Sequence, residues 1–166
     1  YTVDPSGAGS LYLNHYVPLE YSSIQSAINS SFSNDTIIVG EGSYTESIIF
    51  PDHNLVIRGD GPESTIISSD TTGVRFPTTG DPYTSILENV SVHVAANQKG
   101  FIATDDYHPN FDHVAFVLDS NSIAGHLSTS AAVSMDHVTV VRNTADANGN
   151  SFQLNNSDLT VTNSIL

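Results

Sequence analysis

The sequence predicts an all-β solenoid, a parallel β-helix, and three observations carry this prediction. A phrase of one apolar residue, one acidic residue, Asn or His, and Val begins at Leu87, at Phe111 and at Met135. The two steps between these positions are equal, and we call this interval the repeat step; a looser copy of the phrase begins at Val161, after a slightly longer step. A constant period of about twenty to fifty residues is typical of a solenoid, in which each repeat covers the apolar face of its neighbour. The repeated units are short and β-branched, and no helix of useful length fits between them. Strands joined in this way can run parallel only if the chain coils.

Residues 1–35 are predicted to form a leading segment that caps the first coil. Apolar residues recur at helical spacing within 22–29, and Ser22 or Ser23 can cap the start of a helix there. One or two helical turns are all that this pattern supports. A short amphipathic helix would cover the unpaired strand edges of the first coil, which would otherwise invite aggregation.

Residues 36–166 are predicted to form about five to seven coils, within one domain that spans 1–166. Turn-forming residues separate short β-branched runs. The early runs are 36–39, 47–50, 55–57 and 65–67. Further along, the repeat step stacks Val90 on Val114 and Val138, about 4.8 Å apart. Such columns belong to the core, where each fully buried side chain contributes about 1.5–3 kcal/mol. The last coil is expected to lack a cap.

A column of Asn and His residues follows the acidic residue of each phrase. Its members are Asn89, His113, His137 and Asn163. Two consecutive polar residues break the alternation of a strand at this point, which predicts a tight bend between two strands. Asn tolerates left-handed backbone better than most residues, and His is also enriched there. Stacked amides can also hydrogen-bond along a column. We therefore interpret the column as a structural ladder.

The first part of the sequence resembles a known superfamily. The motifs that carry the resemblance are YTVD at 1–4, YSSIQSAI at 21–28, DTIIV at 35–39, GSYTE at 42–46, IRGDG at 57–61 and TII at 65–67. Their order is similar to the start of pectin-lyase-like right-handed parallel β-helix proteins, among them pectin methylesterases and bacterial surface proteins. The Asn and His column also resembles the asparagine ladder of that superfamily. The resemblance implies a right-handed parallel β-helix, but no single activity, because the opening pattern belongs to enzymes and non-enzymes alike.

No catalytic residue carries over from these relatives. The Gln and paired Asp motifs of pectin methylesterases, with their following Arg, have no match in this sequence. Pectate lyases rely on calcium-binding acids and a catalytic Arg, whereas the only late arginine here, Arg142, lies in a stretch without an acidic nest. The prediction therefore leans against an enzyme.

The composition excludes several classes of partner. The net charge is −14, with four basic residues against eighteen acidic ones, so the clustered phosphate contacts of nucleic-acid binding are ruled out. No apolar stretch reaches the roughly 18 residues of a membrane span, so no membrane insertion is expected. No cysteine is present for a disulfide or a thiolate metal site. A surface rich in Ser, Thr and Asn, and an opening Tyr1 that we interpret as a mature or trimmed end, lead us to expect a secreted or cell-surface protein.

An acidic and aromatic cluster is the first candidate site. The repeat step stacks Asp81 on Asp105, beside Asp106, and stacks Tyr83 on Tyr107. Oxygen ligands from adjacent coils would suit calcium, which would also relieve the repulsion between like charges. The two tyrosines would offer an aromatic face to a sugar. The alternative is a solvated stack of acidic loops.

A second acidic column lies beside the histidines of the ladder. It consists of Glu88, Asp112 and Asp136, next to His113 and His137. Acid–base catalysis or a metal site would use these residue types together. The alternative is a bend that faces water, in which His and carboxylate groups hydrogen-bond to each other.

The sequence predicts an extracellular structural or adhesive module, which either assembles end to end into filaments or belongs to a longer surface protein. The alternative is a carbohydrate-active enzyme of lyase or esterase type, or a carbohydrate-binding module, that acts on acidic polysaccharide. The expected partners are a second copy or the remainder of a longer chain, bound through the C-terminal coil, and a polysaccharide. Calcium is the expected ion. Four glycosylation sequons begin at Asn29, Asn34, Asn89 and Asn155, and in a chain this rich in Asn, Ser and Thr we attribute most of them to chance.

Overall fold

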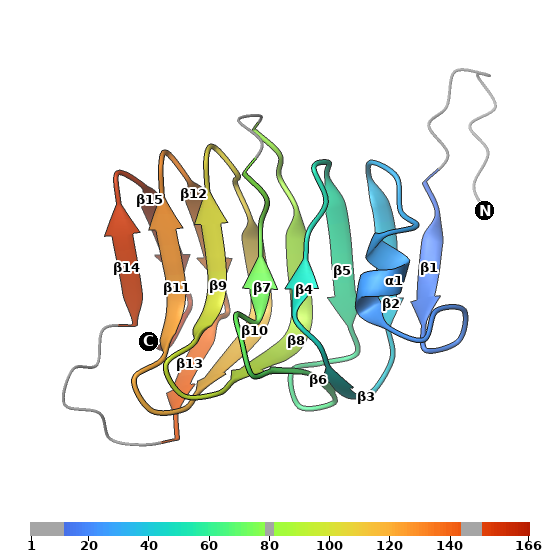
Figure 1. Ribbon diagram of the computed structural model, residues 1–166, viewed down its shortest axis with the longest axis horizontal. Helices are drawn as coiled ribbons and strands as arrows, with labels where there is room; N and C mark the ends of the chain where they lie inside the picture. The colour runs from blue at the N-terminus through green and yellow to red at the C-terminus, as the bar shows by residue number, and fades with distance from the viewer. Residues whose placement is uncertain (1–11, 79–81, 144–150) are drawn as a thin grey trace.

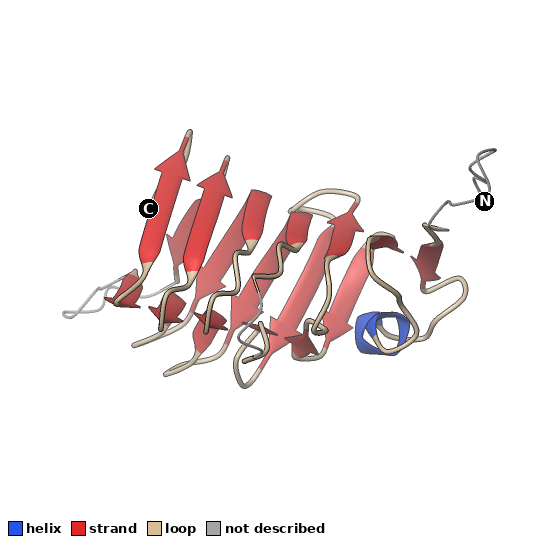
Figure 2. Cartoon of the chain, turned by 90° about the horizontal axis from the view of Figure 1, so that it is seen from above, coloured by secondary structure: helices blue, strands red, loops and turns tan. Residues whose placement is uncertain are grey.

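The computed structural model describes residues 12–78, 82–143 and 151–166. In this part of the chain the backbone forms a right-handed parallel β-helix of about six turns, so the predicted fold class is confirmed. Figure 1 shows the strands side by side along one axis, and Figure 2 shows the same coils from above. None of the described residues belongs to a helix long and apolar enough to cross a lipid bilayer.

The coil has three faces, and the strands of each face pair in parallel with those of the neighbouring coils. The first face consists of β1 (Asn14–Val17), β2 (Asp35–Val39), β5 (Leu55–Gly59), the first halves of β8 (Ile86–Val94) and β10 (Asn110–Leu118), β12 (Ala132–Asp136) and β15 (Asp158–Thr162). The second face consists of β3 (Gly42–Thr45), β6 (Thr65–Ser69), the second halves of β8 and β10, and β13 (Thr139–Arg142). The third face consists of β4 (Ile48–Ile49), β7 (Val74–Arg75), β9 (Lys99–Thr104), β11 (Ile123–Ser128) and β14 (Phe152–Asn155).

The strand register confirms the predicted repeat step. Phe111 lies opposite Leu87 on one side and opposite Met135 on the other. Val114 lies opposite Val90. All five side chains are buried. Equivalent residues of adjacent parallel strands point to the same face, so the apolar side chains form continuous columns inside the coil.

Aromatic rings fill the middle of the core. Phe50 stacks on Phe76 with ring centroids 4.6 Å apart, and Phe101 lies 4.6 Å from Phe111. Phe111 in turn meets Phe116 edge to face at 5.5 Å. Aromatic pairs in these arrangements contribute about 0.5–1.5 kcal/mol beyond their buried area. The aromatic rings thus join successive coils as well as opposite faces of one coil.

The one helix among the described residues, α1 (Ile24–Ile28), is shorter than the predicted range 22–29. Ser23 caps its N-terminus in a reciprocal capping box. The Gln25 side chain pairs with the backbone of Ile49 in β4, with Nε2 3.2 Å from the carbonyl oxygen and Oε1 2.7 Å from the amide nitrogen. The helix therefore takes the place of a strand on the third face of the first coil and covers part of the β4 edge.

Candidate functional site

Each later coil turns from the first face to the second at the predicted bend. The residue at the turn has positive φ in four successive coils: 56° at Asn89, 51° at His113, 52° at His137 and 47° at Asn163. Asn and His are among the few residue types that are enriched in this left-handed conformation. The bend therefore accounts for the choice of residue type in this column, and it places the column on the surface between two faces.

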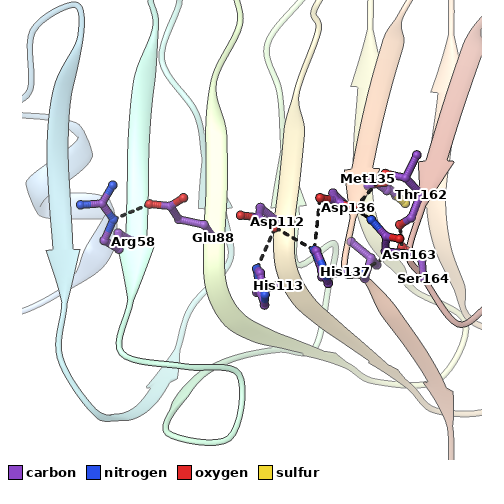
Figure 3. Close-up of polar contacts among 11 residues, drawn as sticks. Arg58, Glu88, Asp112, His113, Met135, Asp136, His137, Thr162, Asn163 and Ser164 are labelled. Carbon is purple, nitrogen blue, oxygen red and sulfur yellow. Dashed lines mark hydrogen bonds and ion pairs between the residues drawn. The ribbon is translucent and has the colours of Figure 1, made fainter.

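A line of polar side chains, which we call the polar row, follows this bend from coil to coil (Figure 3). It consists of Arg58, Glu88, Asp112, His113, Asp136, His137, Thr162 and Asn163. The register sets Asp112 between Glu88 and Asp136. Three carboxylates therefore follow one another on strands about 4.8 Å apart, and the row attracts positive charge.

Two histidine rings stack at the centre of the polar row and share a carboxylate. The ring centroids of His113 and His137 are 4.4 Å apart, and the ring planes differ by 10°. Asp112 Oδ1 lies 2.7 Å from His113 Nδ1 and 3.7 Å from His137 Nδ1. Asp136 Oδ2 lies 3.1 Å from His137 Nδ1. The polar row thus concentrates imidazole nitrogen and carboxylate oxygen at one exposed point.

Hydrogen bonds and an ion pair hold the two ends of the row. Arg58 Nε forms an ion pair with Glu88 Oε1. Asp136 Oδ1 accepts hydrogen bonds of 2.8 Å from Asn163 Nδ2 and 2.8 Å from Thr162 Oγ1. The bond from Asn163, followed by that from Thr162, lowers the pKa of Asp136 below its ordinary value. Asp136 is therefore a fixed negative charge at neutral pH.

A groove of about 360 Å³ opens on the second face, where β6, β8 and β10 end. Its polar lining consists of Thr45, Ser68, Ser69, Asp70, His93, Asp119 and Asn143, and its apolar lining of Val94, Ala95 and Val117. Asn143, one repeat step after Asp119, donates a 3.0 Å hydrogen bond from Nδ2 to Asp119 Oδ1. Among the described residues, no lysine or arginine lines the groove. The groove therefore offers hydrogen-bonding groups and negative charge.

His93 is the ionisable base of this groove. Burial lowers the pKa of His93, and the negative charge of Asp119 opposes the shift only in part. The imidazole is therefore neutral at pH 7. Neither of its ring nitrogens has a hydrogen-bond partner in the part of the chain that the structure describes. His93 is half-buried and lines the groove, so its imidazole is a candidate partner for a bound ligand.

The structure corrects the expectation that Tyr107 offers a ring to a sugar. Tyr107 is fully buried, its ring lies 5.0 Å from that of Phe76, and burial raises the pKa of its phenol to about 12. Its hydroxyl lies 2.8 Å from Ser85 Oγ and donates to the carbonyl oxygen of Pro51 at 3.2 Å. Tyr83 is half-buried and packs 6.1 Å from Tyr107. The large ring belongs to the core because its hydroxyl finds partners there.

The predicted calcium site lies partly at the turn after β9. Asp105 and Asp106 have φ values of 51° and 59°, and the Asp106 amide donates to the carbonyl oxygen of Thr129 at 3.2 Å. Asp106 is exposed and Asp105 is half-buried. Asp81, the third predicted ligand, lies outside the described residues. Calcium binding by these residues stays a prediction.

A buried polar network in the first coil was missed by the sequence reasoning. His15 Nε2 lies 3.0 Å from Asp35 Oδ2, and His15 Nδ1 lies 3.1 Å from the hydroxyl of Tyr21. The amides of Leu13 and Phe32 each donate a 2.8 Å hydrogen bond to the Asp35 carboxylate. The available signal was the spacing of His15 and Val17, because residues two apart in a strand point to the same face and Val17 is apolar. The network links β1 to β2, and its role is structural.

Comparison with protein families finds no matching family, and comparison with curated proteins finds no match. Among solved structures, the chain is similar to a crystal structure of a pectin methylesterase mutant in complex with a hexasaccharide. The TM-score is 0.55 and the sequence identity is 10%, over 87% of this chain and 70% of that chain. The similarity shows that the two chains share a fold, which fits the resemblance of the leading motifs to the pectin-lyase-like superfamily.

Proposed function

We propose that this chain is an extracellular adhesive β-helix module that binds carbohydrate through the groove on its second face. The groove is the observation that carries the proposal, because it combines hydrogen-bonding side chains with the apolar side chains of Val94, Ala95 and Val117. Sugar rings need both, since their hydroxyl groups pair with polar side chains and their C–H faces contact apolar ones. The hexasaccharide in the similar pectin methylesterase structure supports the proposal as a precedent for this fold.

The charge of the groove favours a neutral or amino sugar over an acidic one. Asp70 and Asp119 line it, and the chain as a whole carries a net charge of −14. Like charges would repel a polyanionic polysaccharide, most strongly at low salt. A carboxylate also accepts two hydrogen bonds from adjacent sugar hydroxyls, and such charge-assisted bonds are stronger than neutral ones. An acidic polysaccharide is therefore the less favoured ligand.

A glycan array that includes neutral, amino and acidic oligosaccharides tests the proposal, followed by calorimetric titration with the best ligand. We expect Asp119→Asn to weaken binding about tenfold or more, since a hydrogen bond to a charged group contributes about 1.5–3 kcal/mol. The matched control is Asp112→Asn, which removes the same charge from the polar row and should leave binding unchanged. An array without hits, or equal losses in the two variants, would contradict the proposal.

An enzyme is the second candidate, and His93 is the observation that favours it. An imidazole that is neutral at pH 7 and lies in a groove can serve as a general base. The same oligosaccharides, incubated with the chain and analysed by mass spectrometry, separate the two candidates. Unchanged oligosaccharides support the adhesive module. Cleaved or deesterified products that are absent with the His93→Gln variant would instead show that the chain is an enzyme.

A further inference from the structure

We propose that Asp112, His113 and His137, at the centre of the polar row, form a binding site for a divalent transition-metal ion of the zinc, copper or nickel class. One ligand atom from each of these side chains lies within 4.8 Å of the others. The site lies at the bend between the first and second faces, whereas the groove lies at the far ends of β6, β8 and β10. The inference is therefore independent of the proposed carbohydrate binding.

The distances between the donor atoms suit one ion. A tetrahedral metal ion with ligands at about 2.0–2.2 Å holds its ligand atoms about 3.3 Å apart. Asp112 Oδ1 is 2.7 Å from His113 Nδ1 and 3.7 Å from His137 Nδ1, so the observed separations lie on both sides of this value. Rotation of the two exposed imidazole rings out of their parallel stack would direct both Nδ1 atoms and Asp112 Oδ1 at one ion. The ion would replace the hydrogen bond between His113 Nδ1 and Asp112 Oδ1.

The backbone presents the two histidines together. His113 and His137 occupy the same bend in successive coils, with φ values of 51° and 52°, and their rings are almost parallel. The register of β10 and β12 sets Asp112 beside Asp136. The backbone of the three ligands therefore belongs to an ordered ladder, and only side-chain freedom is lost when an ion binds.

The charges around the site favour a cation. Glu88 and Asp136 lie on either side of Asp112 in the row, and Arg58 forms its ion pair with Glu88. Asp136 Oδ2 also lies 3.1 Å from His137 Nδ1, while its Oδ1 is held by two hydrogen bonds. Asp136 therefore adds negative charge next to the ion, and its contact with His137 Nδ1 would give way to the bond between that nitrogen and the metal.

The donor types decide the class of ion. Imidazole nitrogen suits zinc, copper and nickel, whereas calcium and magnesium prefer oxygen ligands alone. The side chains of Asp112, His113 and His137 are 43%, 52% and 47% exposed, so water can complete the coordination. Three protein ligands and an open position are the arrangement of a metal site that stays accessible.

The ladder itself provides the matched variants. Its other two residues, Asn89 and Asn163, hold the same bend with φ values of 56° and 47°. His113→Asn and His137→Asn should therefore keep the fold and remove one nitrogen ligand each. Asp112→Asn removes the oxygen ligand. His126→Asn is the control, because His126 lies on the third face, where its Nδ1 pairs with Gln153.

Calorimetric titration of the untagged chain with zinc chloride tests the site. We expect one equivalent of zinc to bind, at least about tenfold more weakly in each of the three ligand variants and unchanged in His126→Asn. Nuclear magnetic resonance of the native chain provides a second readout, since substoichiometric Ni²⁺ should broaden the ring signals of His113 and His137 before those of His126. Native affinity in both His113→Asn and His137→Asn would overturn the proposal. So would the absence of zinc binding at about 1 mM, or Ni²⁺ broadening that affects His126 first.

Discussion

His pairs with Asp in two regions of the molecule, one of them buried and the other exposed to water. In the first coil, His15 is 6% exposed and Asp35 is 0% exposed. In the polar row, the side chains of Asp112, His113 and His137 are about half exposed. In the buried network the backbone amides and a tyrosine hydroxyl hold the pair from several sides. In the polar row, two rings compete for one carboxylate and water reaches all three groups.

The comparison shows that burial, and not residue type, decides what a His and Asp pair does. A buried carboxylate without its partners would remain desolvated, so the network contributes to stability and excludes a ligand. An exposed ion pair contributes little to stability because water replaces each lost contact. The exposed pair can therefore exchange its internal hydrogen bonds for a metal ion, and the buried pair cannot. Three changes test this contrast.

Replacing Asp35 with Asn is expected to have the largest effect on stability. The new amide turns two donor hydrogens toward a site that already holds the Leu13 and Phe32 amides, so buried donors lose their acceptor. We expect the free energy of unfolding to fall by about 3 kcal/mol. Urea unfolding with linear extrapolation measures it. The matched Asp112→Asn change should cost less than about 1 kcal/mol, and equal losses in the two variants would contradict the comparison.

Acid is expected to remove the contribution that the buried network makes to the stability of the fold. Burial alone would raise the pKa of Asp35, but hydrogen bonds from His15 and from the Leu13 and Phe32 amides hold it below the ordinary value of 3.8. A group with a lowered pKa stabilises the fold fully above its unfolded pKa, and this stabilisation is lost as the pH falls through the folded pKa.

The stability advantage of the native chain over Asp35→Asn should therefore shrink as the pH falls below 3.8. Urea unfolding of both proteins, from neutral pH down to about pH 3, measures the difference. Comparing the two proteins at each pH cancels the titration of the other carboxylates that they share. An advantage that persists unchanged in acid would show that Asp35 is not ionised in the fold.

Substitutions of His113 are expected to have the smallest effect on the free energy of unfolding. They separate the contribution of the backbone conformation from that of the side chain. His113→Asn should change the free energy of unfolding by less than about 0.5 kcal/mol, because Asn is favoured in left-handed backbone. His113→Val should cost about 1–2 kcal/mol, because a β-branched residue is strained at a φ of 51°. Melting temperatures of both variants measure the contrast. Equal melting temperatures would show that the bend does not constrain residue 113.

The periodic pattern of residues was enough to predict the coil and its core. The repeat step predicted that Phe111 lies between Leu87 and Met135, and the register agrees. This is possible because contacts in a solenoid join each residue to its equivalent one repeat away. A bend was likewise predicted where Asn89 and His113 now show positive φ, because that conformation depends on local sterics alone.

The direction and the contacts of individual side chains, in contrast, depend on how the coils pack together. Tyr107 turns inward because Ser85 and a carbonyl oxygen from an earlier coil satisfy its hydroxyl, and no repeat relates those groups. His15 meets Asp35 only because β1 pairs with β2 in the first coil, where the sequence shows no copy of the repeated phrase. The groove around His93 likewise forms only where the ends of β6, β8 and β10 lie side by side. Periodicity specifies which backbones are neighbours, whereas burial, rotamer and hydrogen-bond partner are settled only when the coils pack together.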